Sequence, residues 1–473
     1  MPLSAAEFAQ RQHHARQLQR VSALLEDHLA QYGYARIELP LVQDAELFLT
    51  KAGDQIVTRL FTFERGGRVL ALRPEFTAPA AQLYAAQFPA GTQVARWQFH
   101  GTVFEDNARS VAHFQRFTVG AELIGQHGIH ADAEIMAMAV KGLTRLGIDQ
   151  WVLTIGHIQL LHSLLAQFNL DQRTRRFLVT HLPQFAQGEA GAAQVTASLD
   201  TLLMGIPDGG SEVLSLSQGE NNALDTHYIL DVLLDATQRG ETMGGRTRED
   251  IVQRLLHKRK RAAERSQIMA AVDFLKRFSV IDAPPESGFA QLRALIPADD
   301  STSRHLLDTW QRLVGYLESY GVAQDRIRLR PALSRTWDYY TGILFEFGLP
   351  DGQQLGGGGR YDELARLVSG LIDHDLPSVG FVYYADVIAA YTQPPTARTP
   401  VMLIAHSAAL KESIRWAEAL RSLGADVVLT DADALPSSVH ASVTDTGALG
   451  FDGQQYLFEQ VEAVAHILKG WQA

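Results

Sequence analysis

The segment RTWDYYTGILFEFGLPDGQQLGGGGRYD, residues 335–362, combines strand-like runs with an unusual density of polar binding groups. Its run TGILFEF is β-branched and aromatic, and the following GLPDG is typical of a turn, so the segment predicts a β-hairpin. Four consecutive glycines at 356–359 let a backbone come close to a small molecule. Arg360, Tyr361 and Asp362 then offer a cation, a phenol and a carboxylate. The segment predicts the floor of a ligand site, with a glycine-rich hairpin whose tyrosines edge the core as the alternative.

Two phosphate-binding motifs do not fit this glycine run. A P-loop needs a lysine and a serine or threonine after its last glycine, whereas Arg-Tyr-Asp follows here. The dinucleotide fingerprint needs a third glycine where Tyr361 stands, and a buried parallel strand where this sequence has a turn. The pattern therefore argues against both kinds of nucleotide site.

Composition limits the class of protein. With 473 residues, of which 46% are hydrophobic, the chain can bury a large core and is expected to form two to four domains. No apolar run approaches the roughly 18 residues of a membrane span, and the start of the sequence lacks the order of a signal peptide, so we expect a cytoplasmic protein without a membrane partner. The net charge of -11 disfavours nucleic acid as a partner. The one basic run, HKRKR at 257–261, is interpreted as a solvated helix face.

The sequence gives little support for a metal site or for thiol chemistry. The absence of cysteine removes disulfides, thiolate zinc sites and cysteine nucleophiles. There is no His-Glu-x-x-His motif, and His127 and His130 are interpreted as polar loop residues. We therefore expect neither a metal nor a cofactor.

The hydrophobic pattern predicts the order of elements in the first part of the chain. Residues 5–31 have helical spacing, and residues 35–42 alternate like a strand that Pro40 confines to an edge or an interface. The later predictions are a hairpin turned by Gly66-Gly67, a helix from Thr77 to about Gln87, strands at 94–104 and 114–123, a helix from Asp132 to about Gly147, and a strand at 151–156.

The remaining pattern suggests the domain organisation. Residues 166–324 are mostly helical and are interpreted as an inserted subdomain, which leaves 1–165 and 325–392 as one core. Residues 391–400, YTQPPTARTP, are typical of a linker. Residues 401–473 begin with a β-α-β pattern and predict a small α/β domain.

Several motifs, in order, resemble the histidyl-tRNA synthetase family. They are GYARIELPLVQDAELF, LRPEFT, FHGTVFEDNARSVAHFQRFTVGAELIG, SRTWDYYTGILFEF, GGGGRYDEL and PSVGF. The resemblance implies an α+β fold with a class II aminoacyl-tRNA synthetase-like antiparallel sheet flanked by helices. It also likens residues 401–473 to a shortened anticodon-binding domain.

The resemblance further implies a histidine pocket. In it, Glu75 and Thr77 would hold the α-amino group, Glu122 and Tyr361 would meet the imidazole, Arg335 would pair with the carboxylate, and Tyr340 would line the wall. Such charge-assisted contacts give specificity because other amino acids leave them unsatisfied. The sequence departs from the family here, because the motif is one residue shorter before Glu122 and Thr118 replaces a glutamine.

The ATP half of the family site is altered. Glu105 and Asn107 stand where the family has an arginine and a glutamate, and Val387 stands where it has a second phosphate-binding arginine. A carboxylate repels the triphosphate, and losing one such contact typically costs about 3 kcal/mol. Arg109 and Arg116 lie nearby in the sequence, and whether either restores ATP binding stays open.

A synthetase-like protein that keeps a histidine pocket but does not activate histidine with ATP resembles the regulatory subunits of ATP phosphoribosyltransferase. Four segments are similar in sequence to members of that family: LRPEFTAP, VGAELIG, DAEIMAMAVKGL and IGHIQLLHSLL. This implies a non-catalytic homodimer that senses histidine, assembles with a short-form catalytic subunit and serves the first step of histidine biosynthesis. Residues 401–473 are atypical of such subunits.

Two alternatives follow from the same resemblance. One is a histidine-tRNA ligase with divergent ATP contacts. The other is an RNA-binding or kinase-associated synthetase paralogue that uses its C-terminal domain. Against the second, the cations of residues 401–473 are outnumbered by acidic residues and consist of Lys411, Arg415, Arg421 and Lys469.

Overall fold

The computed structural model divides the chain into two compact units. It describes residues 4–49, 59–106, 114–204, 265–335, 337–392, 401–404, 409–430 and 440–472. One unit is Val21–Thr392, and the other combines Met1–Arg20 with Gln393–Ala473. Among the described residues, no helix is both long and apolar enough to cross a membrane.

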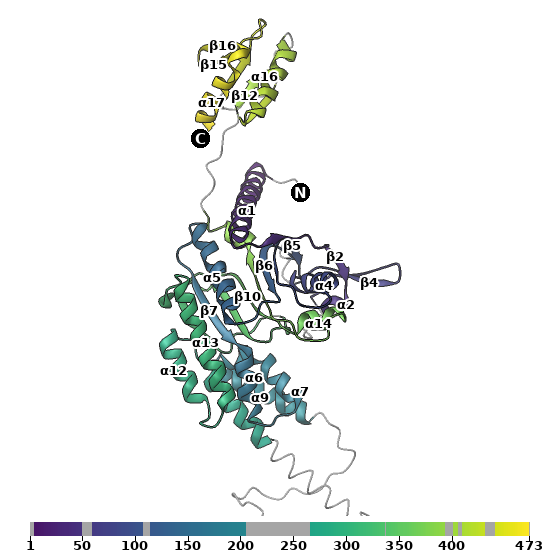
Figure 1. The fold of residues 1–473 in the computed structure, drawn as a ribbon, viewed down its shortest axis with the longest axis vertical. Coiled ribbons are helices and arrows are strands. Elements are labelled where there is room, and N and C mark those ends of the chain that lie inside the picture. Colours follow the sequence, from purple (N-terminus) through teal and green to yellow (C-terminus); the bar gives the residue numbers. More distant parts are fainter. Residues whose placement is uncertain are drawn as a thin grey trace, which may run out of the picture. The chain divides into compact units, whose positions relative to one another are not determined.

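An eight-stranded sheet forms the centre of the larger unit (Figure 1). Its order is β1-β5-β6-β11-β10-β9-β7-β8, in which the pairs from β5 to β7 are antiparallel and the two outermost pairs, β1-β5 and β7-β8, are parallel. The strands are β1 (Ala35–Arg36), β5 (Ala95–Phe104), β6 (Gln115–Ile124), β7 (Val152–His157), β8 (Ile327–Leu329), β9 (Ile343–Gly348), β10 (Gln354–Arg360) and β11 (Ser378–Tyr384). This confirms the predicted α+β fold with a mainly antiparallel sheet.

Helix α5 (Ile129–Arg145) covers one face of this sheet. It packs on β9, β10 and β11, and α13 (Ser301–Ser319) lies against it (Figure 1). Tyr383 of β11 points to this face, because its hydroxyl donates hydrogen bonds to the carbonyl oxygens of Met138 and Ala139. Side chains alternate along a strand, so Val382 and Tyr384 point to the opposite face.

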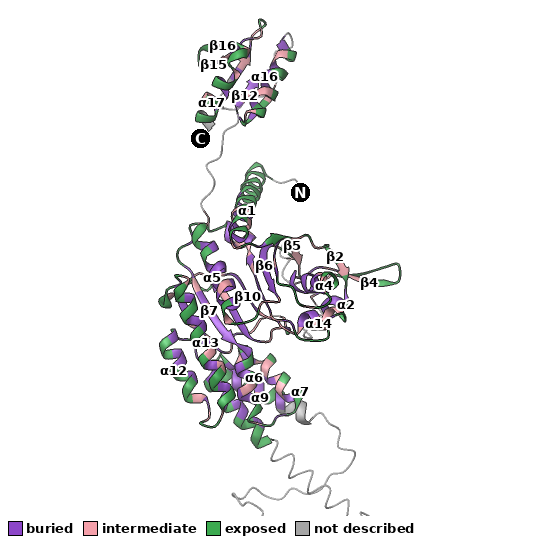
Figure 2. Ribbon diagram, viewed as in Figure 1, coloured by how far each residue is buried: buried purple, intermediate pink, exposed green. Residues whose placement is uncertain are grey.

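The opposite face carries a second group of helices. Helix α4 (Thr77–Gln87) packs on α14 (Leu364–Ser369) and contacts β6 and α2 (Glu46–Leu49). The core here includes the buried rings of Tyr84, Trp97 and Tyr361. Buried residues make up most of the central strands β6 and β10 (Figure 2). A separate three-stranded sheet has the order β2-β4-β3, with β2 (Val42–Asp44), β3 (Thr62–Arg65) and β4 (Arg68–Leu72).

The structure corrects the strand predicted at 35–42. That segment contributes only β1, while β2 begins at Val42 in the three-stranded sheet. Arg73 explains the break, because its Nη1 donates to the carbonyl oxygen of Leu39 at 2.6 Å and its backbone N–H donates to that of Leu41 at 2.9 Å. Pro40, between them, has no N–H to offer a ladder. The carbonyl groups of Leu39 and Leu41 therefore bond to Arg73 and not to a neighbouring strand.

Helices fill the connection from β7 to β8. The helices described over their whole length are α6 (Ile158–Ala166), α7 (Gln172–Thr180), α8 (Leu182–Phe185), α9 (Glu189–Met204), α12 (Pro285–Leu295) and α13. Residues 265–279 are also helical. Asp171 caps α7 and Asp300 caps α13, each accepting a backbone hydrogen bond. The basic run at 257–261 lies outside the described residues.

The C-terminal sheet has the order β13-β12-β14-β15-β16. Strands β12 (Val401–Ile404) and β13 (Val427–Thr430) are parallel and are joined by α16 (Leu410–Ser422), which confirms the predicted β-α-β unit. The unit is completed by β14 (His440–Val443), β15 (Leu449–Phe451), β16 (Gln454–Tyr456) and α17 (Val461–Gln472). The buried ring of Trp416 lies in its own core.

Candidate functional site

The four glycines predicted to form a ligand floor lie in β10, between β9 and β11. A Cβ atom on Gly358 would lie 1.9 Å from the carbonyl oxygen of Gly380, and one on Gly356 would lie 2.3 Å from the ring of Phe347. A Cβ atom on Gly357 would lie 2.1 Å from Nη1 of Arg335. The space left by these glycines is thus taken by neighbouring strands and by the Arg335 guanidinium.

A cavity of about 230 Å³ opens above this floor. Its lining comes from β10 and β11, from the segment that leads into α4, from the adjoining ends of β5 and β6, and from residues 334–340. Among the residues expected to bind histidine, those that line it are Glu75, Thr77, Arg335, Tyr340 and Tyr361. The fold therefore gathers these side chains from distant parts of the sequence.

Glu122 lies beneath the cavity floor. Its side chain is 1% exposed, and it accepts a hydrogen bond from the Thr77 hydroxyl at 2.7 Å and one from the Tyr361 hydroxyl at 2.5 Å. A Cβ atom on Gly380 would overlap its Oε2 atom. Burial raises the pKa of Glu122 to about 8, against the lowering effect of the two hydroxyl donors. Glu122 itself does not line the cavity, but Thr77 and Tyr361, which donate hydrogen bonds to it, do.

Glu75 is the second carboxyl group of the site, and it is partly buried. It accepts hydrogen bonds from the backbone N–H groups of Thr77 and Ala78 at the start of α4. Burial raises its pKa to about 7, although these donors oppose the shift. Because a carboxylate in this position is stabilised by a nearby cation, the site suits a ligand that carries a positive charge.

Arg335 has a guanidinium group without full hydrogen bonding. Its Nη2 lies 3.4 Å from the Tyr384 hydroxyl, and its Nη1 lies 3.7 Å from Oε1 of Glu346 and has no hydrogen-bond partner among the described residues. Burial opposes its charge, but Tyr340, Tyr384 and Glu346 keep its pKa above the ordinary value. Buried donors are normally satisfied. The unused donor, on a residue that lines the cavity, suits an anionic group of a ligand.

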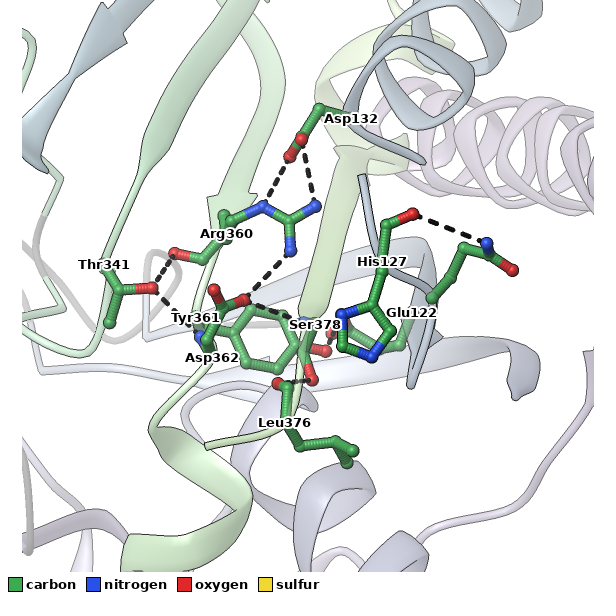
Figure 3. A network of polar contacts seen from close by, with 10 residues as sticks. Glu122, His127, Asp132, Thr341, Arg360, Tyr361, Asp362, Leu376 and Ser378 are labelled. Carbon is green, nitrogen blue, oxygen red and sulfur yellow. Dashed lines mark hydrogen bonds and ion pairs between the residues drawn. The ribbon is translucent and has the colours of Figure 1, made fainter. Parts of the chain in front are cut away.

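Arg360 and Asp362 do not face the cavity in the way the sequence suggested. Arg360 forms a two-pronged ion pair with Asp132, at 2.9 Å for each bond, and donates to Asp362 at 3.0 Å (Figure 3). Asp362 also accepts from the backbone of Ser378 at 2.9 Å. This network ties β10 to α5 and β11 around Tyr361. Asp132 was missed as a supporting residue, since nothing local in the sequence marks it as the partner of Arg360.

The residues expected to replace the ATP contacts of the family are dispersed. Glu105 lines the cavity and pairs with Arg59. Val387 lies in α15 (Ala385–Ala389) and is not part of the cavity lining. Arg116 lines the cavity, with its guanidinium 4.1 Å from the centre of the Tyr384 ring. Asn107 and Arg109 lie outside the described residues.

Acidic groups outnumber basic groups in the described cavity lining. Its cations are Arg116 and Arg335, and its carboxylates are Glu75, Glu105 and Glu346. A triphosphate would therefore find no excess of positive charge in this lining. Among the described residues, no group of three or more histidine, cysteine, aspartate or glutamate side chains is placed to hold a metal ion.

Comparison with known proteins shows which family the chain belongs to. The model of the histidyl-tRNA synthetase family matches residues 9–250 and 228–388. The chain belongs to the histidyl-tRNA synthetase family. Within this family it is 30% identical to an ATP phosphoribosyltransferase regulatory subunit of Allorhizobium ampelinum, over 77% of this chain and 95% of the relative. It is also 30% identical to the corresponding subunit of Agrobacterium fabrum, over 75% and 92%.

Ligases of the histidyl-tRNA synthetase family are also similar to the chain. A histidine–tRNA ligase of Methanococcus vannielii is 26% identical over 76% of this chain and 68% of the ligase. A solved structure described as an ATP phosphoribosyltransferase regulatory subunit/histidyl-tRNA synthetase from Bacillus halodurans has a TM-score of 0.62 and 20% identity, covering 89% and 90% of the two chains. The resemblance to the regulatory subunits of this family is confirmed, and the family match ends before the C-terminal sheet begins.

Proposed function

We propose that the chain is a non-catalytic, histidine-sensing regulatory subunit of ATP phosphoribosyltransferase that serves the first step of histidine biosynthesis in the cytoplasm. The observation that carries the proposal is that one cavity has groups suited to an amino acid and has a carboxylate where a triphosphate would need a cation. Arg335 offers an unused donor and Glu75 a partly buried carboxyl group, while Glu105 stands where a triphosphate would need a cation. The naming of the relatives at 30% identity supports the same function.

Histidine matches the chemistry of the cavity. Its carboxylate would pair with Arg335, its α-amino group would approach Glu75 and Thr77, and its imidazole would lie near Tyr361, with Glu122 acting through the Tyr361 hydroxyl. A cavity of about 230 Å³ has room for an amino acid of this size. Paired charges in a buried site give specificity because another ligand would leave one of them unsatisfied.

The proposed partner is a short-form catalytic subunit that transfers the phosphoribosyl group to ATP. Histidine that binds this chain more tightly in one state of the assembly must shift the partner toward that state by the same free energy, typically about 1 to 3 kcal/mol. The regulatory effect therefore needs no catalytic residue in this chain.

The decisive experiment mixes this chain with the catalytic subunit of the same organism. Phosphoribosyl-ATP formation is measured across a histidine titration, with the catalytic subunit alone as the control. We expect higher activity in the mixture and a fall in that activity as histidine is added. A mixture no more active than the catalytic subunit alone would contradict the proposal.

A histidine–tRNA ligase is the second candidate, favoured by the relatives at 26% identity. Such a ligase must exchange labelled pyrophosphate into ATP in the presence of histidine. We expect no exchange above background from the purified chain. Exchange together with charging of tRNA would replace the regulatory proposal with the ligase.

We also propose a homodimer formed through the synthetase-like core. Strand β1 lies at one edge of the eight-stranded sheet and, among the described strands, pairs only with β5, which leaves an edge suited to a second chain. Light scattering at micromolar concentration, without the catalytic subunit, should give the mass of a dimer. A monomeric mass would remove this part of the proposal.

A further inference from the structure

Glu346 lies between two cavities on the same face of the sheet. The first is the candidate histidine cavity, and the second, of about 350 Å³, is lined by Asp282, Arg328, Arg330 and the turn after β9. Glu346 and Gln354 line both. These two side chains therefore form the wall that the cavities share.

Strand register places Glu346 in a row of polar residues across the sheet. Arg328 of β8 pairs with Thr154 of β7, which pairs with Glu346 of β9, which pairs with Gly357 of β10. Residues directly opposite each other on neighbouring strands point to the same face. Nη1 of Arg335 occupies the space above Gly357. Glu346 thus lies between the Arg335 guanidinium and the arginines at β8.

The contact between Glu346 and Arg335 is loose. Nη1 and Oε1 are 3.7 Å apart, too far for a hydrogen bond, although both side chains are largely buried at 11% and 25% exposure. Burial raises the pKa of Glu346, and the charges of Arg335 and then Arg330 oppose that rise. Without a ligand, Glu346 is the nearest carboxylate to Arg335, yet it does not satisfy the free donor.

Arg330 forms an ion pair with Asp282. Its Nη2 donates to Oδ2 of Asp282 at 2.7 Å, and the same carboxylate binds Nε of Arg328 at 2.8 Å. Arg330 is therefore held by Asp282 as a second cation near Glu346.

We propose that Glu346 sets the histidine affinity of the cavity by competing with the ligand carboxylate for Arg335, and that Arg330 stabilises Glu346 when the ligand takes its place. This inference rests on the proposed histidine-binding function and adds a regulator of affinity to it. A ligand carboxylate must displace Glu346 from its loose pairing with Arg335, and breaking this pairing weakens the net binding of the ligand. Arg330 reduces this cost because it offers the displaced Glu346 another cation.

The first test is Glu346→Gln, studied by calorimetry with L-histidine and with histamine, which lacks the carboxylate. We expect about threefold to tenfold tighter binding of histidine, the range expected for loss of one weak ion pair. Histamine does not compete for Arg335, so its affinity should stay the same or fall. Weaker or unchanged histidine binding, or an equal gain for both ligands, would overturn the proposal.

The second test separates Arg330 from Arg328, its matched control on the same Asp282. Arg330→Gln should weaken histidine binding about twofold to fivefold, whereas Arg328→Gln should leave it within error. In a Glu346→Gln background, Arg330→Gln should lose most of its effect, since the two residues would act as one unit. Additive effects in this double-mutant cycle would exclude the role given to Arg330.

Failure of this inference can be told from failure of the proposed function. If the unaltered chain does not bind histidine, the proposed function is wrong and the Glu346 mechanism falls with it. If the unaltered chain binds histidine but Glu346→Gln gives no gain, only the mechanism is wrong. Should Glu346→Gln fail to fold by circular dichroism, Glu346→Asp, which moves the carboxylate away from Arg335, should give a smaller gain, and no gain would overturn the mechanism.

Discussion

Arg59 and Glu105 form an ion pair at one end of the cavity, with Nη1 of Arg59 2.9 Å from Oε1 of Glu105. The acidic residue expected to replace a phosphate contact of the family therefore has a basic partner within the chain. That partner is engaged by a carboxylate.

Restoring one arginine should not create a ligase. In Glu105→Arg, Arg59 loses its partner and two cations face each other, while Val387 still supplies no group for the far phosphates. We expect pyrophosphate exchange to stay at background for this variant, as for the unaltered chain. Histidine-dependent exchange by Glu105→Arg alone would show that the altered residue at 105 was the only obstacle.

Removing the Arg335 guanidinium should weaken histidine binding. Arg335→Ala is expected to lose about 2 kcal/mol or more of binding free energy in calorimetry, because the ligand carboxylate then lacks its charged donor. Arg366→Ala is a suitable control, since Arg366 is half-exposed and pairs with Asp375 outside the cavity. Equal affinity in Arg335→Ala and the unaltered chain would remove the pocket assignment.

The two carboxyl groups of the site predict how stability depends on pH. Burial raises the pKa of Glu75 to about 7 and that of Glu122 to about 8, above the ordinary value of 4.5. Raised values favour the folded state at low pH, and that contribution is lost as pH rises through them. Between about pH 6.5 and 8, the free energy of unfolding should fall by up to about 1.4 kcal/mol per pH unit for each carboxyl that the folded state keeps protonated, and the fall should level off above the higher of the two pKa values.

Urea denaturation at stepped pH values, without ligand, measures this effect. The chosen window lies above the range in which the buried His28 and His157, whose pKa values are lowered by burial, contribute with the opposite sign. Glu122→Gln should flatten the slope. A slope that is the same with and without Glu122 would assign the pH dependence to other groups.

The Asp132–Arg360 pair should matter for stability as well as for the site. Asp132→Ala leaves the buried Arg360 without its two-pronged partner and should lower the free energy of unfolding by about 3 to 5 kcal/mol. Asp375→Ala breaks an exposed pair with Arg366 and should cost less than about 1 kcal/mol. Similar losses of unfolding free energy in the two variants would mean that the buried Asp132–Arg360 pair contributes no more to stability than the exposed Asp375–Arg366 pair.

Local pattern was sufficient for much of the fold. The periodicity of residues 5–31 predicted α1 (Ala5–Gln31), and the turn signals after TGILFEF predicted the hairpin of β9 and β10. These elements follow from neighbours in the sequence, so their signals are local. Strand 35–42 was predicted too long, because Arg73 satisfies its carbonyl groups from a distant part of the chain.

The candidate site was predictable only in part. Family motifs pointed to Arg335, Glu75 and Tyr361, which do line one cavity. Glu346 stands within the motif SRTWDYYTGILFEF, but the motif gave it no role, because the proposed role depends on strand register and on a guanidinium lying above Gly357. Likewise, Arg360 looked like a ligand group until the fold placed Asp132 beside it. Such pairings depend on tertiary structure, which a single sequence does not display.

The connection between β7 and β8 limits how far the chain can be shortened. These strands are neighbours and run parallel, so the chain must return from the end of β7 to the opposite end of the sheet before β8 begins. A tight turn cannot do this. Engineers seeking a minimal histidine sensor could vary the number of helices in this connection, but they would have to keep at least one crossover segment of a dozen or more residues. Arg328 and Arg330, which follow that crossover, would otherwise lose their place beside Glu346.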